Sequence, residues 1–478
     1  MKKQNWLPLI LFLLFGGVVH AQEGNKEGYT LKECIELGLK NNAEIKKSIL
    51  DEKEAGYLRK EITGTGLPQL EAYGNYNNFL DVYPQAIPGG ILDPNSDPNG
   101  VDVIAFGVPQ SLKGGVQLSQ LVFSQSYLIG LKAAKTSEEF YRLITEMTTE
   151  DIIYDIAMNY YGVISTQLQM INLEANHDKL IKLEAIIKSQ YENDLARKVD
   201  YNRVKVNLTS LETQMDDLET LIEQRSNYLK LVMGIPVTDE LSLAAYNFED
   251  HSNQQGILLE DVDLSNRYDL QVLDKQQELN ALNIKNIKSG YYPTIAAFAD
   301  LNYNAFSNSF DFLSSSHQWY RGSLVGIQLN IPIFDGNQRK NKIAQARMQS
   351  EKLKHDQYLA EQKAQADYLN AVKKINNSLK SLEAQQSNLV LSETVFDQTN
   401  QLYREGLSPL TDVLDSETAL REARAAYFNQ MINVKTAEAD FYQSIGQIKK
   451  KIVSNNYEKI NHTLGICVYS RCYWFYTL

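Results

Sequence analysis

The sequence has 478 residues, of which 43% are hydrophobic, 10% aromatic and 22% charged, and its formal net charge is −12. The aromatic content excludes a disordered chain, and a mean hydropathy of −0.35 excludes a protein built from many membrane-spanning helices. The acidic balance argues against a nucleic-acid-binding protein, because phosphate contacts need clustered Lys and Arg. Taken alone, these averages are typical of a soluble protein of two or three domains.

Residues 1–21 carry the pattern of a secretory signal peptide. Two lysines precede an apolar run from Leu7 to Val19, and Ala21 offers a small residue at the expected cut. A retained membrane anchor would need about 20 apolar residues, and this run is shorter. No Cys follows the cut, so we expect an exported protein without a lipid anchor.

The distribution of Pro and Gly predicts two very long helical hairpins. No proline lies between Pro109 and Pro236, and only Pro409 follows Pro332. Stretches of this length without helix breakers predict long helices, each interrupted once, near residues 193–194 and 406–409. At 1.5 Å per residue the longest arms approach about 100 Å, so we expect an elongated molecule.

A seven-residue apolar period shows that the two hairpins are copies of one another. The apolar ladders of the two hairpins coincide at every position when one is shifted by 212 residues. A second apolar seam runs along the first hairpin, and Arg225 is its polar exception. The strict period of seven predicts coiled-coil packing, and the offset predicts an internal repeat. The two ladders are Tyr201, Leu208, Met215, Ile222, Leu229 and Val413, Leu420, Tyr427, Val434, Phe441.

Each half also carries two segments with the alternation of β-strands. The second half has Ala297–Ala305 and Val325–Ile333, the first has Gln69–Phe79 and Val116–Phe123, and we expect the loop 81–114 to be a long exposed turn. Strands of about 10 residues with one apolar face can cross a bilayer when tilted, and nearby aromatics fit an interfacial girdle, although aromatics favour any strand. A barrel needs about eight or more strands, so several chains would have to share one.

These patterns divide the chain into five parts. We expect a signal peptide at 1–21, a first repeat at 22–234, an inter-repeat equatorial linker at 235–266, a second repeat at 267–446 and a tail at 447–478 outside the core fold. The fold class is mainly α with a transmembrane β part.

The residues supply few candidates for chemistry. We find no nucleophile elbow, phosphate loop, HExxH helix or CxxC pair, and no His at metal-ligand spacing, so we expect no enzymatic activity, cofactor or metal. Asp412 and Asp415 lie one turn apart, and in a trimer they would form two carboxylate rings that attract cations. The alternative is that both acids simply complement the start of a helix.

Several segments resemble the TolC family of outer-membrane efflux proteins. The resemblance covers about residues 29–446, and its most specific segment is Tyr403–Asp415; Thr30–Ile35, Leu118–Phe123 and Arg267–Leu270 also match. It implies a homotrimer in the outer membrane with a 12-stranded β-barrel, continued in the periplasm by an α-helical barrel.

The resemblance also implies roles for residues near the hairpin tips. Asp412 and Asp415 match the entrance aspartates, and Asp200 and Tyr403 match a latch that closes the entrance. Ser408 stands where the best-known member of the family carries a basic residue, and Arg404 could substitute for that residue in the latch. The segments that match the adaptor-docking tips are Leu195, Ala196, Gly406, Leu407 and Ser408.

The resemblance therefore predicts the exit duct of a tripartite efflux system, working with a periplasmic adaptor protein and an inner-membrane pump of the RND or ABC type. A duct for type I protein secretion is the alternative within this class. From other classes, a periplasmic adaptor or scaffold predicts a single hairpin, and a barrel enzyme needs eight or more strands in one chain. The repeat predicts two hairpins and four strands.

Overall fold

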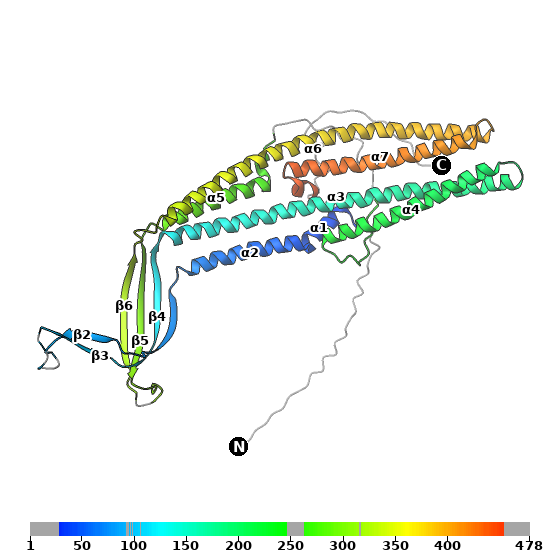
Figure 1. Cartoon of the computed structure of the whole chain (residues 1–478). Helices are drawn as coiled ribbons and strands as arrows, with labels where there is room; N and C mark the ends of the chain where they lie inside the picture. The colour runs from blue at the N-terminus through cyan, green and yellow to red at the C-terminus, as the bar shows by residue number, and fades with distance from the viewer. Residues whose placement is uncertain are drawn as a thin grey trace, which may run out of the picture.

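The computed structural model describes residues 28–91, 95, 97, 99–105, 107–245, 262–314 and 317–453. The expected signal peptide and the tail beyond residue 453 lie outside this part. The molecule is an elongated rod, with a β-sheet at one end and two helical hairpins that reach the other end (Figure 1).

The two halves of the chain repeat one order of helices and strands. The first half contains α1 (Leu31–Asn41), α2 (Ala43–Gly64), β1 (Gln69–Asn78), β2 (Pro84–Pro88), β3 (Val101–Ala105), β4 (Gln110–Ser124), α3 (Gln125–Glu192) and α4 (Lys198–Met233). The second half contains the short helix η1 (Leu264–Asn266), α5 (Tyr268–Ser289), β5 (Thr294–Ser307), β6 (Tyr320–Asn330), α6 (Gln338–Arg404), α7 (Leu410–Ser444) and the short helix η2 (Lys449–Val453).

The two predicted hairpins are confirmed, with turns at the predicted interruptions. α3 has 68 residues and α6 has 67, which corresponds to about 100 Å each. Two hairpins, each preceded by strands of the same sheet, do not match the single hairpin of the adaptor alternative.

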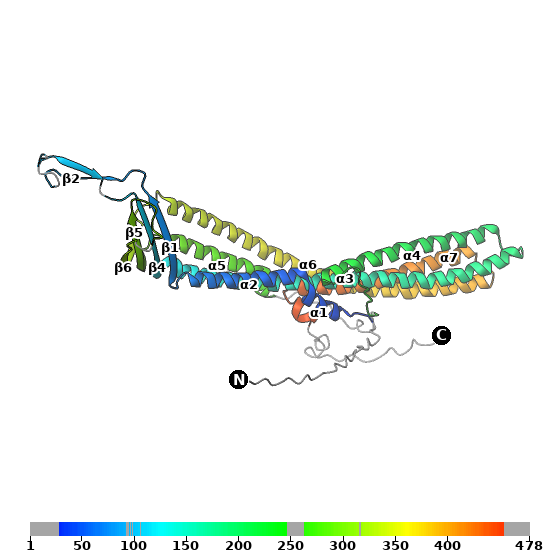
Figure 2. The same ribbon diagram turned by 90° about the horizontal axis from the view of Figure 1, so that it is seen from below.

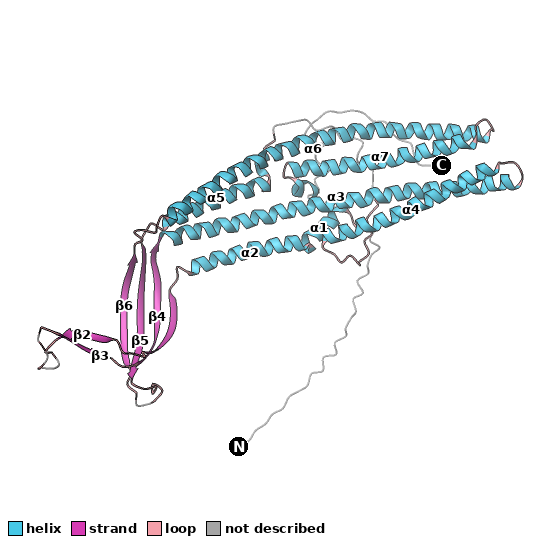
Figure 3. Cartoon of the chain, in the orientation of Figure 1, coloured by secondary structure: helices cyan, strands magenta, loops and turns pink. Residues whose placement is uncertain are grey.

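The four long strands form one antiparallel sheet in the order β1-β4-β5-β6, and Figure 3 shows it at one end of the helices. The loop 81–114 differs from the expected exposed turn. Within it β2 pairs with β3, and this second, two-stranded sheet extends away from the main one (Figure 1). The sequence signal was hidden because both strands have only five residues and β2 begins and ends with Pro, which usually marks loops.

The register gives the main sheet one apolar and one polar face. Leu70 lies opposite Leu118, Leu118 opposite Ala299, and Ala299 opposite Val325, so apolar side chains share one face across all four strands. The strand alternation predicted from the sequence therefore adds up to a continuous two-faced sheet.

Polar side chains on the other face are connected across strands. The hydroxyl of Tyr73 in β1 donates to Asp300 Oδ2 in β5 at 2.8 Å, although β4 separates the two strands. The Asn302 amide also donates to Asp300, and the Asn304 amide donates to Asn302 at 2.6 Å. These hydrogen bonds give Tyr73, Asp300, Asn302 and Asn304 partners within the sheet itself.

The helices pack side by side around α3. α3 contacts α2, α4, α5 and α7, and α6 pairs with α7 (Figure 2). The ends of these helices have local causes: Thr30 and Glu33 form a capping box at α1, and the Ser124 hydroxyl accepts from the Tyr127 N–H at 3.2 Å at the start of α3.

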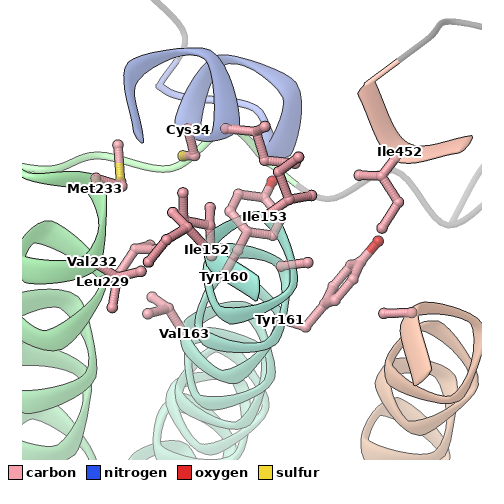
Figure 4. Close-up of a cluster of buried hydrophobic side chains, with 14 of the residues drawn as sticks. Cys34, Ile152, Ile153, Tyr160, Tyr161, Val163, Leu229, Val232, Met233 and Ile452 are labelled. Atoms are coloured by element: carbon pink, nitrogen blue, oxygen red, sulfur yellow. The ribbon is translucent and has the colours of Figure 1, made fainter. Parts of the chain in front are cut away.

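The largest buried cluster lies midway along the rod, where α1 crosses α3 and α4 (Figure 4). Cys34, Ile153 and Met233 are fully buried there. Ile448 and Ile452 belong to the same cluster, so the residues just after 446 pack into the fold and do not belong to an external tail. Their contacts are tertiary, and the heptad period of α7 ends before them.

Arg225 interrupts an apolar seam of α4, and the structure explains why it is tolerated. Its guanidinium donates to the Gly162 carbonyl at 2.7 Å and to Thr166 Oγ1 at 2.9 Å, both on α3. A half-buried charge is accommodated because it has hydrogen-bond partners on the facing helix.

Candidate channel entrance at the hairpin tips

The two hairpin tips have the same backbone conformation. Asp194 and Gly406, related by the 212-residue offset, both adopt positive φ, at 58° and 74°. Leu195 N–H donates to the Gln190 carbonyl at 2.7 Å, and Leu407 N–H donates to the Leu402 carbonyl at 2.8 Å. Both are the closing hydrogen bonds of a Schellman motif, so the repeat extends to the turns.

Each tip presents one leucine to solvent. Leu195 is 80% exposed and Leu407 is 72% exposed, at equivalent positions of the two repeats. Gly406 has open space where a side chain would lie, and Ala196 is half-buried against the neighbouring helices. Of the five residues expected to dock an adaptor, Leu195 and Leu407 are therefore the two exposed apolar side chains, and the other three lie beside them in sequence.

Buried side chains of α3, α4 and α7 hold the two tips together. Val204 and Leu211 of α4 share one cluster with Leu410 and Leu414 of α7. Further from the tip, the Arg421 guanidinium of α7 donates to Gln214 of α4 at 3.3 Å. The two hairpins therefore pack on each other near their tips.

Asp412 and Asp415 are both exposed, just after α7 begins at Leu410. The Ser408 hydroxyl donates to Asp412 Oδ2 at 2.8 Å, and the Thr411 hydroxyl lies 3.4 Å from Asp412 Oδ1. Asp412 thus has local helix-cap partners, and Asp415 points to the side of α7 that faces α4. The structure is therefore compatible with both interpretations of the sequence: acids that complement the start of α7, and exposed carboxylates that could attract cations.

The expected latch residues are only partly brought together. Tyr403 lies close enough to Asp200 that its pKa is raised, first by burial and then by the negative charge of Asp200. Asp200 itself is held by Arg197, whose Nε lies 2.9 Å from Asp200 Oδ2 and whose second contact to Oδ1 is 3.2 Å. Arg404 is exposed and forms no ion pair with any described residue.

Arg197 and Arg203 are the charged tip residues that sequence reasoning missed. Arg203 and Asp415 both line a groove of about 390 Å³ between α4 and α7, which we call the α4–α7 groove. The 212-residue offset relates position 203 to position 415 and could have revealed this pairing. Arg197 had no such signal, because its contact depends on the turn geometry.

The described residues contain neither a cluster arranged to hold a metal ion nor a helix able to span a membrane. Among them, no group of three or more His, Cys, Asp or Glu side chains is arranged to hold a metal ion. No helix in the described part of the chain is both long and apolar enough to span a membrane.

Comparisons with known proteins show what this chain is similar to. Residues 261–447 match the family model described as outer membrane efflux protein. The outer membrane protein TolC of Escherichia coli (strain K12) is 20% identical over 460 residues, which cover 93% of this chain and 87% of that protein.

Solved structures share the fold. The outer membrane protein VceC of Vibrio cholerae has a TM-score of 0.67 at 15% identity, covering 87% of this chain and 96% of its own. The outer membrane channel CmeC of Campylobacter jejuni has a TM-score of 0.66 at 15% identity, with 87% and 86% covered. The family match over residues 261–447, the similarity to TolC along most of the chain and the two-hairpin fold together make the chain similar to the TolC-type outer membrane efflux proteins.

Proposed function

We propose that this protein is the outer-membrane exit duct of a tripartite efflux system and conducts substrates passively from the periplasm and an inner-membrane pump to the outside. The observation that carries this proposal is the continuity of sheet and helix. β4 ends at Ser124 and α3 begins at Gln125, so a two-faced sheet continues directly into a helix of about 100 Å. This arrangement suits a conduit that leaves a bilayer and crosses an aqueous compartment.

The working unit is a homotrimer. β1 and β6 are the edge strands of the four-stranded sheet, and three copies pairing edge to edge would close a barrel of 12 strands. The apolar face would then contact lipid, and the polar face, with its Tyr73–Asp300 bond, would line the lumen.

The hairpin tips form the periplasmic entrance. Asp412 and Asp415 provide carboxylate rings that attract cations, and Asp200 with Tyr403 contributes to a latch in which Arg197 joins or replaces Arg404. The exposed leucines at 195 and 407, with Ala196, Gly406 and Ser408 beside them, provide the surface on which the tips of a periplasmic adaptor dock.

The duct carries out no chemistry of its own. The energy for transport comes from the inner-membrane pump, and the adaptor couples the pump to the entrance. The protein is therefore a channel and not an enzyme.

Single-channel recording in planar lipid bilayers tests the proposal. Purified trimer should give discrete conductance steps, and La³⁺ added on the side of the tips should block them. The double variant Asp412→Asn/Asp415→Asn should conduct and lose most of this block, because the carboxylates that hold La³⁺ are gone.

The matched control is Glu422→Gln, an exposed acid further along α7, which should keep the block of the wild type. Light scattering of the detergent-extracted protein should give the mass of a trimer. A soluble monomer without conductance would overturn the proposed duct, and an unchanged block in the double variant would overturn the role of the two aspartates.

A further inference from the structure

The charges that face the α4–α7 groove are not only acidic. Arg203 projects from α4 and Asp415 from α7, and both line this groove. The side chains form no ion pair within the described chain, so each charge is available to the space between the helices.

The internal repeat places these two residues at the same height. α4 and α7 both begin just after a Schellman turn of the same conformation, and the turn positions 194 and 406 differ by 212 residues. Positions 203 and 415 differ by the same number, so each lies nine residues beyond its turn. Charges on equivalent turns of parallel-running helices meet in one layer.

A second layer lies one helical turn nearer the tips, at Asp200 and Asp412. Asp200 is neutralised by the two contacts from Arg197. Asp412 accepts only from the neutral hydroxyls of Ser408 and Thr411, so no cationic partner among the described residues balances its charge. The layer nearer the tips therefore carries one net negative charge per chain, and the layer of Arg203 and Asp415 carries none.

We propose that Arg203 sets the ion selectivity of the entrance by cancelling the charge of Asp415. This inference rests on the proposed function, since three chains would place Arg203 and Asp415 in alternation around one opening. Of these two layers, only the one that holds Asp412 then carries net negative charge. An entrance with one effective carboxylate ring repels anionic substrates less than an entrance with two.

The test is the potassium-to-chloride permeability ratio, measured from reversal potentials in a KCl gradient across a planar bilayer. Arg203→Gln adds one net negative charge per chain at this layer. A unit negative charge about 6 Å from a permeating ion in water raises the local concentration of K⁺ roughly threefold and lowers that of Cl⁻ by the same factor, so the ratio should rise roughly tenfold. The La³⁺ block should strengthen in the same variant.

The double variant Arg203→Gln/Asp415→Asn separates charge from shape. This layer is then neutral again, so the permeability ratio should return to the wild-type value. Arg203→Lys keeps the charge and should also match the wild type. Lys205→Gln, which removes a positive charge from an exposed position of α4 outside the α4–α7 groove, is the matched control and should change the ratio little.

Two results would overturn the inference: an Arg203→Gln ratio equal to that of the wild type, or a double variant that fails to restore it. If either result is found while the wild-type protein conducts, the proposed duct function stands and only the role of Arg203 is removed. Wild-type protein without conductance removes the proposed function itself.

Discussion

Glu150 makes the stability of the helical rod depend on pH. It lies half-buried on α3 near the middle of the rod, and its pKa is raised from 4.5 to about 7. The main cause is burial, which Lys449 opposes, while the negative charges of Asp151, Glu146 and Asp269 add to it. Above about pH 7 the folded chain therefore carries Glu150 as a carboxylate, and burial makes this charged form less favourable than the neutral acid.

The size of the effect follows from this change. Each tenfold change in proton affinity corresponds to about 1.4 kcal/mol, so a rise from 4.5 to about 7 gives at most roughly 3.4 kcal/mol. Solvent screens a half-buried group, and we reduce the figure to about 1–2 kcal/mol. Because the pKa is higher in the folded state, the stabilisation is complete below about 4.5 and is lost as the pH rises to about 7.

Glu150→Gln should therefore stabilise the protein at pH 8 and have no such benefit at pH 4.5. Loss of helical circular dichroism on heating, measured from pH 4.5 to 8.5, should show a midpoint about 1–2 °C above the wild type at pH 8. Asp151 and Asp155 also have pKa values raised by burial, so some slope remains in the variant. Glu174→Gln, at an exposed position of α3, is the control. A Glu150→Gln slope identical to that of the wild type would refute the reasoning.

Two further changes test the packing of the rod by the same thermal unfolding. Arg225→Ala should cost about 2 kcal/mol, because the charged hydrogen bonds to Gly162 and Thr166 are lost, and an unchanged midpoint would show that these bonds contribute nothing. Gly234→Ala should cost more than 2 kcal/mol, since φ is +70° and a Cβ would lie 2.6 Å from backbone of the α1 end. Gly406→Ala has a similar φ of +74° but open space, so it should cost only about 1 kcal/mol; equal losses would contradict the role of the close contact.

Local periodicity explains how much of this protein could be predicted. The absence of Pro and Gly over more than 100 residues, the period of seven and the strand alternation are properties of neighbouring residues, and they predict α3, α4, α6, α7 and the four main strands. The 212-residue offset also predicts the equivalence of the two tips, which the matching turns at Asp194 and Gly406 confirm.

The contacts between distant elements depend on something else. The Arg197–Asp200 pair at the tip, the partners of Arg225 and the burial of Ile448 and Ile452 all escaped the sequence patterns. Each depends on the rotation of a helix about its axis or on the path of a turn, and a shift of one residue would place a different side chain at the same point.

The sequence by itself thus determined which segments are helices and strands, where the hairpins turn, and that the chain is a duplication, because backbone conformation and amphipathic faces follow from local order. Only the tertiary structure decided the strand register that aligns Glu71, Gln117 and Asp300 on one face, and the stagger that brings Arg203 and Asp415 to one groove. Such contacts arise from the summed packing of whole helices and sheets, which no short period in the sequence encodes.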